Sequence, residues 1–78
     1  MNTRIAKLLL AGIAESKMNE SGIQSEGYAA AIVAINQIKT AAQYSDDLTQ
    51  EESAFLDAER AHYRAKFDAA IAHEDAEC

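Results

Sequence analysis

The sequence predicts an all-α fold, a compact three-helix domain that spans residues 1–78. Its 78 residues include no proline and only three glycines, so little in the chain interrupts a helix. Apolar residues recur at spacings of three and four, which is the period of an amphipathic helix. Seventeen residues are alanine, so large side chains for a core are few, and a domain this small often gains stability by self-association. We therefore expect a helical-bundle homodimer.

The first helix is predicted over residues 3–19. Asn2 or Thr3 can cap its N-terminus, because a side-chain oxygen there accepts hydrogen bonds from the first free backbone N–H groups. Leu10 lies off the apolar stripe on which we expect this helix to pack. That stripe consists of Ile5, Leu8, Leu9 and Ile13.

The second helix is predicted over residues 26–44, with Ser25 as its N-cap. Residues 28–35 are all apolar, and such a run cannot face one core because successive residues point about 100° apart. A helix that is apolar on most sides is central in its domain or buried in an interface. The alternative is that alanines tolerate exposure and only two large residues need explaining. The predicted self-association residues are Leu10, Tyr28, Ile32 and Val33.

The third helix is predicted over residues 50–73, and its start is the clearest signal in the chain. Thr49-Gln50-Glu51-Glu52 fits a capping box, in which the Thr hydroxyl and the Glu carboxylate each accept a backbone N–H. Residues 74–78 are acidic where the helix dipole is already negative, so we expect a flexible tail. The expected core stripe is Leu56, Tyr63, Phe67, Ala70 and Ile71. A second stripe, which would let another helix approach closely, is Ala54, Ala58, Ala61, Ala65, Ala69 and Ala72.

Charge is distributed unevenly along the chain. Residues 1–44 carry four basic and three acidic side chains, whereas residues 45–78 carry three basic and ten acidic ones. The net charge of -6 disfavours direct binding to nucleic acid or to anionic membrane, and favours a protein partner with a basic surface. No apolar run is long enough for a membrane span, and a single cysteine without an export signal predicts a cytoplasmic location.

No motif in the sequence predicts catalysis or a cofactor. No glycine-rich turn is present to bind phosphate, and no nucleophile stands in a recognisable setting beside a base. Glu59 and His62 have the Glu-x-x-His spacing that di-iron bundles use, but those bundles need further carboxylates on apolar faces. A metal carrier is therefore only a second alternative.

We expect a non-enzymatic inhibitor or adaptor that occludes a basic, nucleic-acid-binding surface of its partner. Length, acidity and lack of catalytic motifs are similar in style to those of phage anti-defence proteins, including anti-CRISPR proteins. Leu48 and Phe55 fit equally well as residues that cover the end of the core. The predicted partner-binding residues are Tyr44, Asp46, Asp47, Leu48, Glu51, Glu52, Phe55 and Asp57.

A structural or regulatory homo-oligomer is the first alternative. One set of residues resembles part of a known family, namely Leu48-Thr49, Glu52, Ala54, Leu56 and His62. This set resembles the last helix of the Hha family, small bacterial proteins that modify nucleoid repressors. The resemblance implies a modulator that acts by protein contact, and the first two helices have no counterpart motif.

Overall fold

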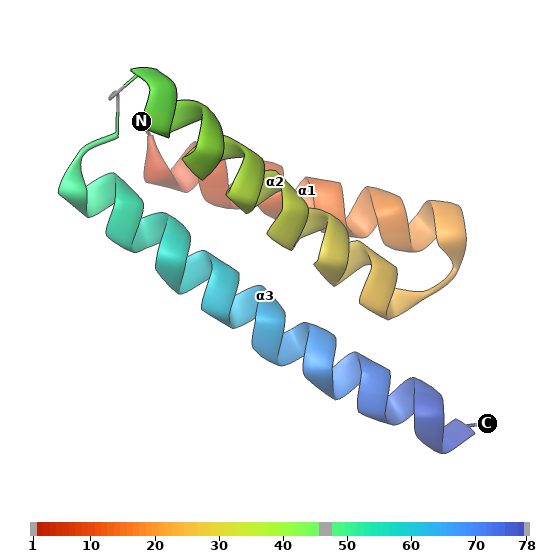
Figure 1. Ribbon diagram of the computed structural model, residues 1–78. Coiled ribbons are helices and arrows are strands. Elements are labelled where there is room, and N and C mark those ends of the chain that lie inside the picture. Colours follow the sequence, from red (N-terminus) through yellow and green to blue (C-terminus); the bar gives the residue numbers. More distant parts are fainter. Residues whose placement is uncertain (1, 46–47, 78) are drawn as a thin grey trace.

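The computed structural model describes residues 2–45 and 48–77, and all regular structure in them is helical (Figure 1). Helix α1 spans Thr3–Ser21, α2 spans Gln24–Ser45 and α3 spans Gln50–Glu77. The predicted all-α class and the three helices are thus confirmed. The helix limits differ from the predicted ones by up to four residues, and three of these differences have clear physical causes, given below.

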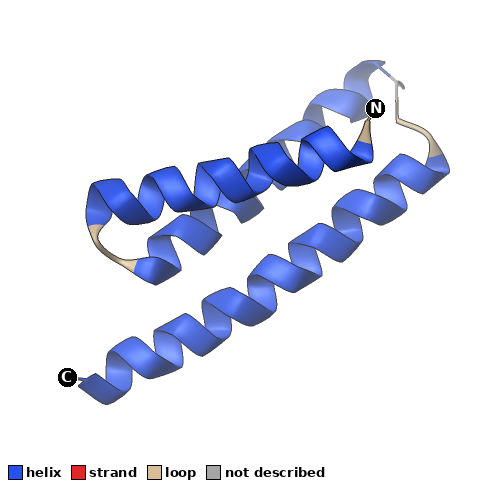
Figure 2. Cartoon of the chain, turned by 180° about the vertical axis from the view of Figure 1, so that it is seen from behind, coloured by secondary structure: helices blue, strands red, loops and turns tan. Residues whose placement is uncertain are grey.

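Helix α2 is the centre of the fold. It packs against both α1 and α3, whereas α1 and α3 meet at only a few residues. Figure 2 shows α1 and α2 joined by a short turn, which lies at Gly22 and Ile23, and α3 running below this hairpin. The molecule is elongated, with principal extents of 45 × 21 × 20 Å. Much of α1 and α3 is therefore left uncovered on the sides that face away from α2.

Both ends of α1 carry recognisable caps. Asn2 Oδ1 accepts hydrogen bonds from the backbone N–H groups of Arg4 and Ile5, which selects Asn2 from the two predicted N-caps. At the other end Gly22 adopts a left-handed conformation (φ 71°), and its N–H donates to Met18 O at 2.8 Å. The helix consequently ends at Ser21 and not at residue 19.

A long-range contact sets the start of α2 and supports the end of α3. The Glu74 carboxylate accepts one hydrogen bond from Ser25 N at 3.1 Å and another from Ser25 Oγ at 2.8 Å. The predicted N-cap role of Ser25 is therefore wrong, because Ser25 lies inside α2 and donates to a side chain 49 residues away. Helix α3 accordingly continues to Glu77, past its predicted end at residue 73. A carboxylate beside the N-terminus of α2 is also favoured by the helix dipole.

The predicted capping box of α3 is confirmed. Thr49 N donates to Glu52 Oε1 at 3.0 Å, and Glu52 N donates to Thr49 Oγ1 at 3.1 Å. These reciprocal bonds fix the first residue of the helix at Gln50, as expected. The short sequence signal was sufficient here because both partners lie within four residues of each other.

The core is small. Among the described residues, its buried cluster is Leu10, Ala14, Ala31, Ile35, Leu56 and Tyr63. The rings of Tyr28 and Tyr63 lie 6.3 Å apart and link α2 to α3. Gly27 allows α1 and α2 to approach closely, because a Cβ at this position would overlap the Ala14 carbonyl oxygen and the Met18 side chain.

Candidate interaction surface

Helix α1 turns four of its larger apolar side chains away from the core, opposite to the prediction. The buried residues of α1 are Leu10 and Ala14, and Met18 packs on the cluster from the same side. At about 100° per residue, Ile5 and Leu9 lie on roughly the opposite side of the helix from Ala14. The exposed fractions are 53% for Ile5, 66% for Leu8, 63% for Leu9 and 39% for Ile13. We call these four residues the α1 face.

The α1 face continues onto α2 through two shallow hollows. One, of about 220 Å³, is lined almost entirely by apolar residues, including Ile5 and Leu9 from α1 and Ile38 from α2. The other, of about 440 Å³, joins Leu9 and Ile13 to Ala30 of α2. Leu9 lines both hollows, so the exposed aliphatic side chains form one continuous surface.

The size of this surface sets it apart from scattered exposed residues. The α1 face alone exposes on the order of 400 Å², within the range of the largest apolar patch on a typical monomer, which is often functional. Single exposed apolar residues are common and need no explanation. Four large aliphatic side chains within nine consecutive residues are not scattered, so this is the strongest candidate site in the molecule.

The predicted self-association residues fall into two groups. Leu10 is 2% exposed and belongs to the core, so it is not available to a partner. Tyr28 and Ile32 are half-buried and pack against the same core, in keeping with the central position of α2. Val33 is 53% exposed and keeps the outward position that the sequence suggested. The apolar run of α2 is thus explained largely by contacts with two helices of its own chain.

Four of the eight predicted partner-binding residues have contacts within the chain that the structure describes. Leu48 and Phe55 pack against the core, which is the alternative that the sequence left open. Glu52 belongs to the capping box, and Asp57 pairs with Lys39. Glu51 is exposed, and Tyr44 is 90% exposed. Asp46 and Asp47 lie outside the described residues.

The hydrogen bond from Lys39 lowers the pKa of the Asp57 carboxyl, with a smaller opposing effect of burial and further lowering by the charges of Lys39 and Arg60. Arg60 also donates to Asn36 Oδ1 at 3.2 Å. These contacts tie α3 to α2. The acidic residue here therefore has a structural role between helices, in addition to its charge.

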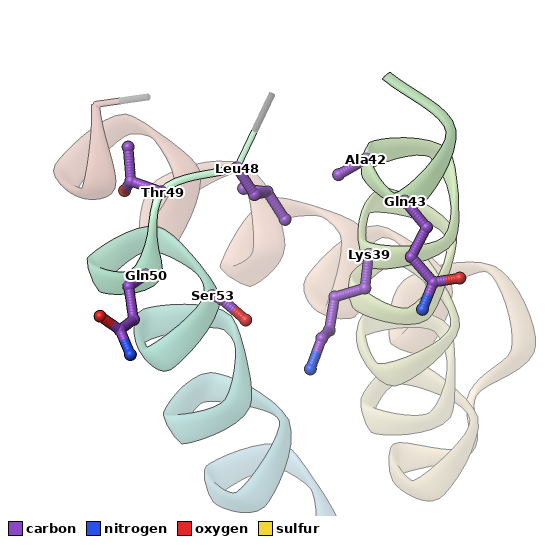
Figure 3. A pocket seen from close by; sticks show the side chains of 7 residues that line it. All are labelled: Lys39, Ala42, Gln43, Leu48, Thr49, Gln50 and Ser53. Atoms are coloured by element: carbon purple, nitrogen blue, oxygen red, sulfur yellow. The ribbon is translucent and has the colours of Figure 1, made fainter. Parts of the chain in front are cut away.

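Another hollow, of about 560 Å³, lies between the C-terminal end of α2 and the start of α3. Figure 3 shows Leu48 between the two helices, with residues from both around it. Among the described residues that line it, Lys39 is the only charged one, so these residues bring no acid–base pair together. The lining residues are Lys39, Ala42, Gln43, Leu48, Thr49, Gln50 and Ser53.

Glu59 and His62 each have contacts with other residues. Glu59 is 7% exposed, and its carboxylate lies 3.6 Å from Lys7 Nζ of α1. The His62 ring is exposed and meets the Tyr63 ring edge to face, with centroids 5.2 Å apart. Within residues 2–45 and 48–77, no three His, Cys, Asp or Glu side chains gather as a metal site would require. Glu59 instead forms an ion pair that joins α3 to α1.

The alanine stripe of α3 is exposed along its length, so the second covered face predicted for this helix has no partner among residues 2–45 and 48–77. No helix in the described part of the chain has the length and apolarity needed to cross a membrane.

No protein-family model, curated protein or solved structure matches this chain. The similarity to the Hha family and to phage anti-defence proteins therefore stays a prediction.

The sequence contained a signal for the α1 face that periodicity alone could not interpret. Leu8, Leu9 and Leu10 are consecutive, and three consecutive helical residues span about 200° of the circumference. At least one of them must then point away from a core on one side. Which side of α1 faces the core depends on how closely α2 approaches α1, and Gly27 permits the close approach.

Proposed function

We propose that this protein is a non-enzymatic interaction module that acts by binding another polypeptide through the α1 face. The observation that carries the proposal is the exposure of four large aliphatic side chains on the side of α1 away from the core. Leaving such a surface in water is unfavourable by roughly 25 cal/mol per Å² of apolar area. Its burial against a partner would recover that free energy, which makes a docking role the most economical account.

The distribution of charge supports an adaptor or inhibitor role. The acidic side chains that favour this role lie mainly on α3, whereas the proposed docking surface is the α1 face. Helix α3 carries eight acidic and three basic side chains, whereas α1 carries two acidic and three basic ones. Acidic fields steer association with basic partners. A protein partner with a basic surface would thus approach the α3 side, and occlusion of its nucleic-acid-binding surface remains the specific form that we propose.

The chemistry of the charged residues favours contact over catalysis. Asp57, Glu59 and Glu74 are each held by a hydrogen bond or an ion pair to another helix. Groups committed in this way stabilise the bundle and are poorly placed to transfer protons to a substrate. The acidic residues would then provide solubility, steering and helix-to-helix contacts.

Photo-crosslinking in living cells tests the docking role. A photoreactive amino acid would replace Leu9 in one variant and Thr40, an exposed residue of α2 outside the α1 face, in a matched control. We expect covalent adducts of the position-9 variant with a polypeptide, of any mass, and few adducts of the position-40 variant. Equal or absent adducts at both positions would refute docking through the α1 face.

A further inference from the structure

We infer that the polypeptide covering the α1 face is a second copy of this chain, with the two α1 helices paired antiparallel about a two-fold axis near Leu9. The inference rests on the proposed docking role of this face and names its occupant. It also replaces the α2-centred interface expected from the sequence, because Leu10, Tyr28 and Ile32 are used within the single chain.

The accessible surface of the chain is larger than that of a typical monomer of the same mass, and the difference is close to the area that a dimer interface would bury. A typical folded monomer of 8.5 kDa exposes about 4,700 Å². This chain exposes 5354 Å², which is more by about 700 Å². Stable interfaces bury about 800 Å² on each partner. The excess is thus close to the area that one symmetric contact would cover.

The spacing of the α1 face suits a symmetric antiparallel contact. Ile5 and Ile13 lie four residues on either side of Leu9, so a two-fold axis near Leu9 places Ile5 of each copy against Ile13 of the other. Gly12 is exposed and has open space above its Cα, which lets the second helix come close. The aliphatic side chains would then fill the space on both sides of the axis.

Two charges at the edge of the face fit the same register. Arg4 and Glu15 are eleven residues apart, so they lie within about 20° of each other around α1. Among the described residues neither side chain has an ion-pair partner in its own chain. In an antiparallel pair of helices related by a two-fold axis, each edge of one helix lies beside the same edge of the other helix. Arg4 of each copy would then meet Glu15 of the other, twice per dimer.

The overall charge favours this side over any other for self-association. Two copies with a net charge of -6 repel one another, and the repulsion is least where their least acidic surfaces meet. Helix α1 has one more basic than acidic side chain, and α3 has five more acidic than basic ones. The same excess of positive charge disfavours a basic partner on α1. A dimer through α1 leaves both α3 helices exposed for such a partner.

Mass measurement with charge reversal tests the inference. Light scattering on the purified full chain should give twice 8.5 kDa, and Leu9→Glu should give 8.5 kDa with unchanged helical circular dichroism. Tyr44→Glu, at a residue 90% exposed and outside the face, should stay dimeric. Arg4→Glu should raise the dimer dissociation constant about tenfold, and adding Glu15→Arg should restore it. The rescue is specific to the antiparallel register.

A disulfide trap provides a second readout that does not depend on folding of a charged variant. In a Cys78→Ser background, Leu9→Cys should form a covalent dimer on mild oxidation because position 9 lies near the axis, and Val33→Cys should form far less. A monomer at all concentrations would overturn the inference. If that monomer still crosslinks through position 9 to a different protein in cells, the docking role stands and only the occupant is wrong.

Discussion

The contact between Glu74 and Ser25 predicts that one carboxylate near the C-terminus of α3 supports the whole domain. Replacing Glu74 by alanine removes two hydrogen bonds to a charged acceptor. The backbone N–H and the hydroxyl of the buried Ser25 then lose this acceptor and can donate only to water that reaches them. Hydrogen bonds to charged groups contribute about 1.5–3 kcal/mol, and loss of a helix cap costs about 0.5–2 kcal/mol. Because Glu74 is half-exposed, we expect the lower part of these ranges, about 1.5 kcal/mol.

The assay is urea denaturation and thermal denaturation, each followed by circular dichroism at one fixed protein concentration. A loss of about 1.5 kcal/mol would lower the melting temperature of a domain of this size by roughly 6–12 °C. Asp75→Ala is the matched control, since it removes the same charge one residue later and Asp75 is exposed. We expect the control to be neutral or slightly stabilising, because an acidic residue at a helix C-terminus opposes the dipole. Equal losses in both variants would refute the specific role of Glu74.

Three further perturbations test the packing and the pairs between helices. Gly27→Ala should destabilise the fold by about 1–3 kcal/mol in the same assay, because its Cβ meets the backbone of α1. Gly22→Ala should lose about 1 kcal/mol or more from the left-handed cap. The pKa of Asp57 is below its usual 3.8, chiefly through the hydrogen bond from Lys39, so its contribution is present at neutral pH and is lost as pH falls through the folded-state pKa. Asp57→Asn should thus be less stable than the native chain at neutral pH, and the difference should shrink as pH falls through the folded-state pKa of Asp57; a difference that stays constant into acid would count against the pair.

Local signals in the sequence were sufficient for the parts of the fold that local contacts decide. Asn2 and the capping box at Thr49 act within four residues along the chain, and both are found where the sequence placed them. The start of α2 and the end of α3 depend on Ser25 and Glu74, which lie 49 residues apart. Sequence signals for helix boundaries involve only residues that are close together in the chain. The predicted start of α2 and the predicted end of α3 were therefore inaccurate for the same physical reason.

The side of α1 that faces the core could not be predicted from its hydrophobicity, because this helix is apolar on two sides. Periodicity favoured the side with the larger residues, centred on Leu9. Packing instead selected Ala14, since a small residue opposite Gly27 allows α1 and α2 to come close enough to bury Ile35 and Leu10. A sequence under selection for a monomer alone would gain solubility by replacing Leu8 or Leu9 with polar residues, at no cost to this core. Their presence on the uncovered side is therefore best explained by a second surface that buries them, and the dimer and crosslinking experiments address that surface directly.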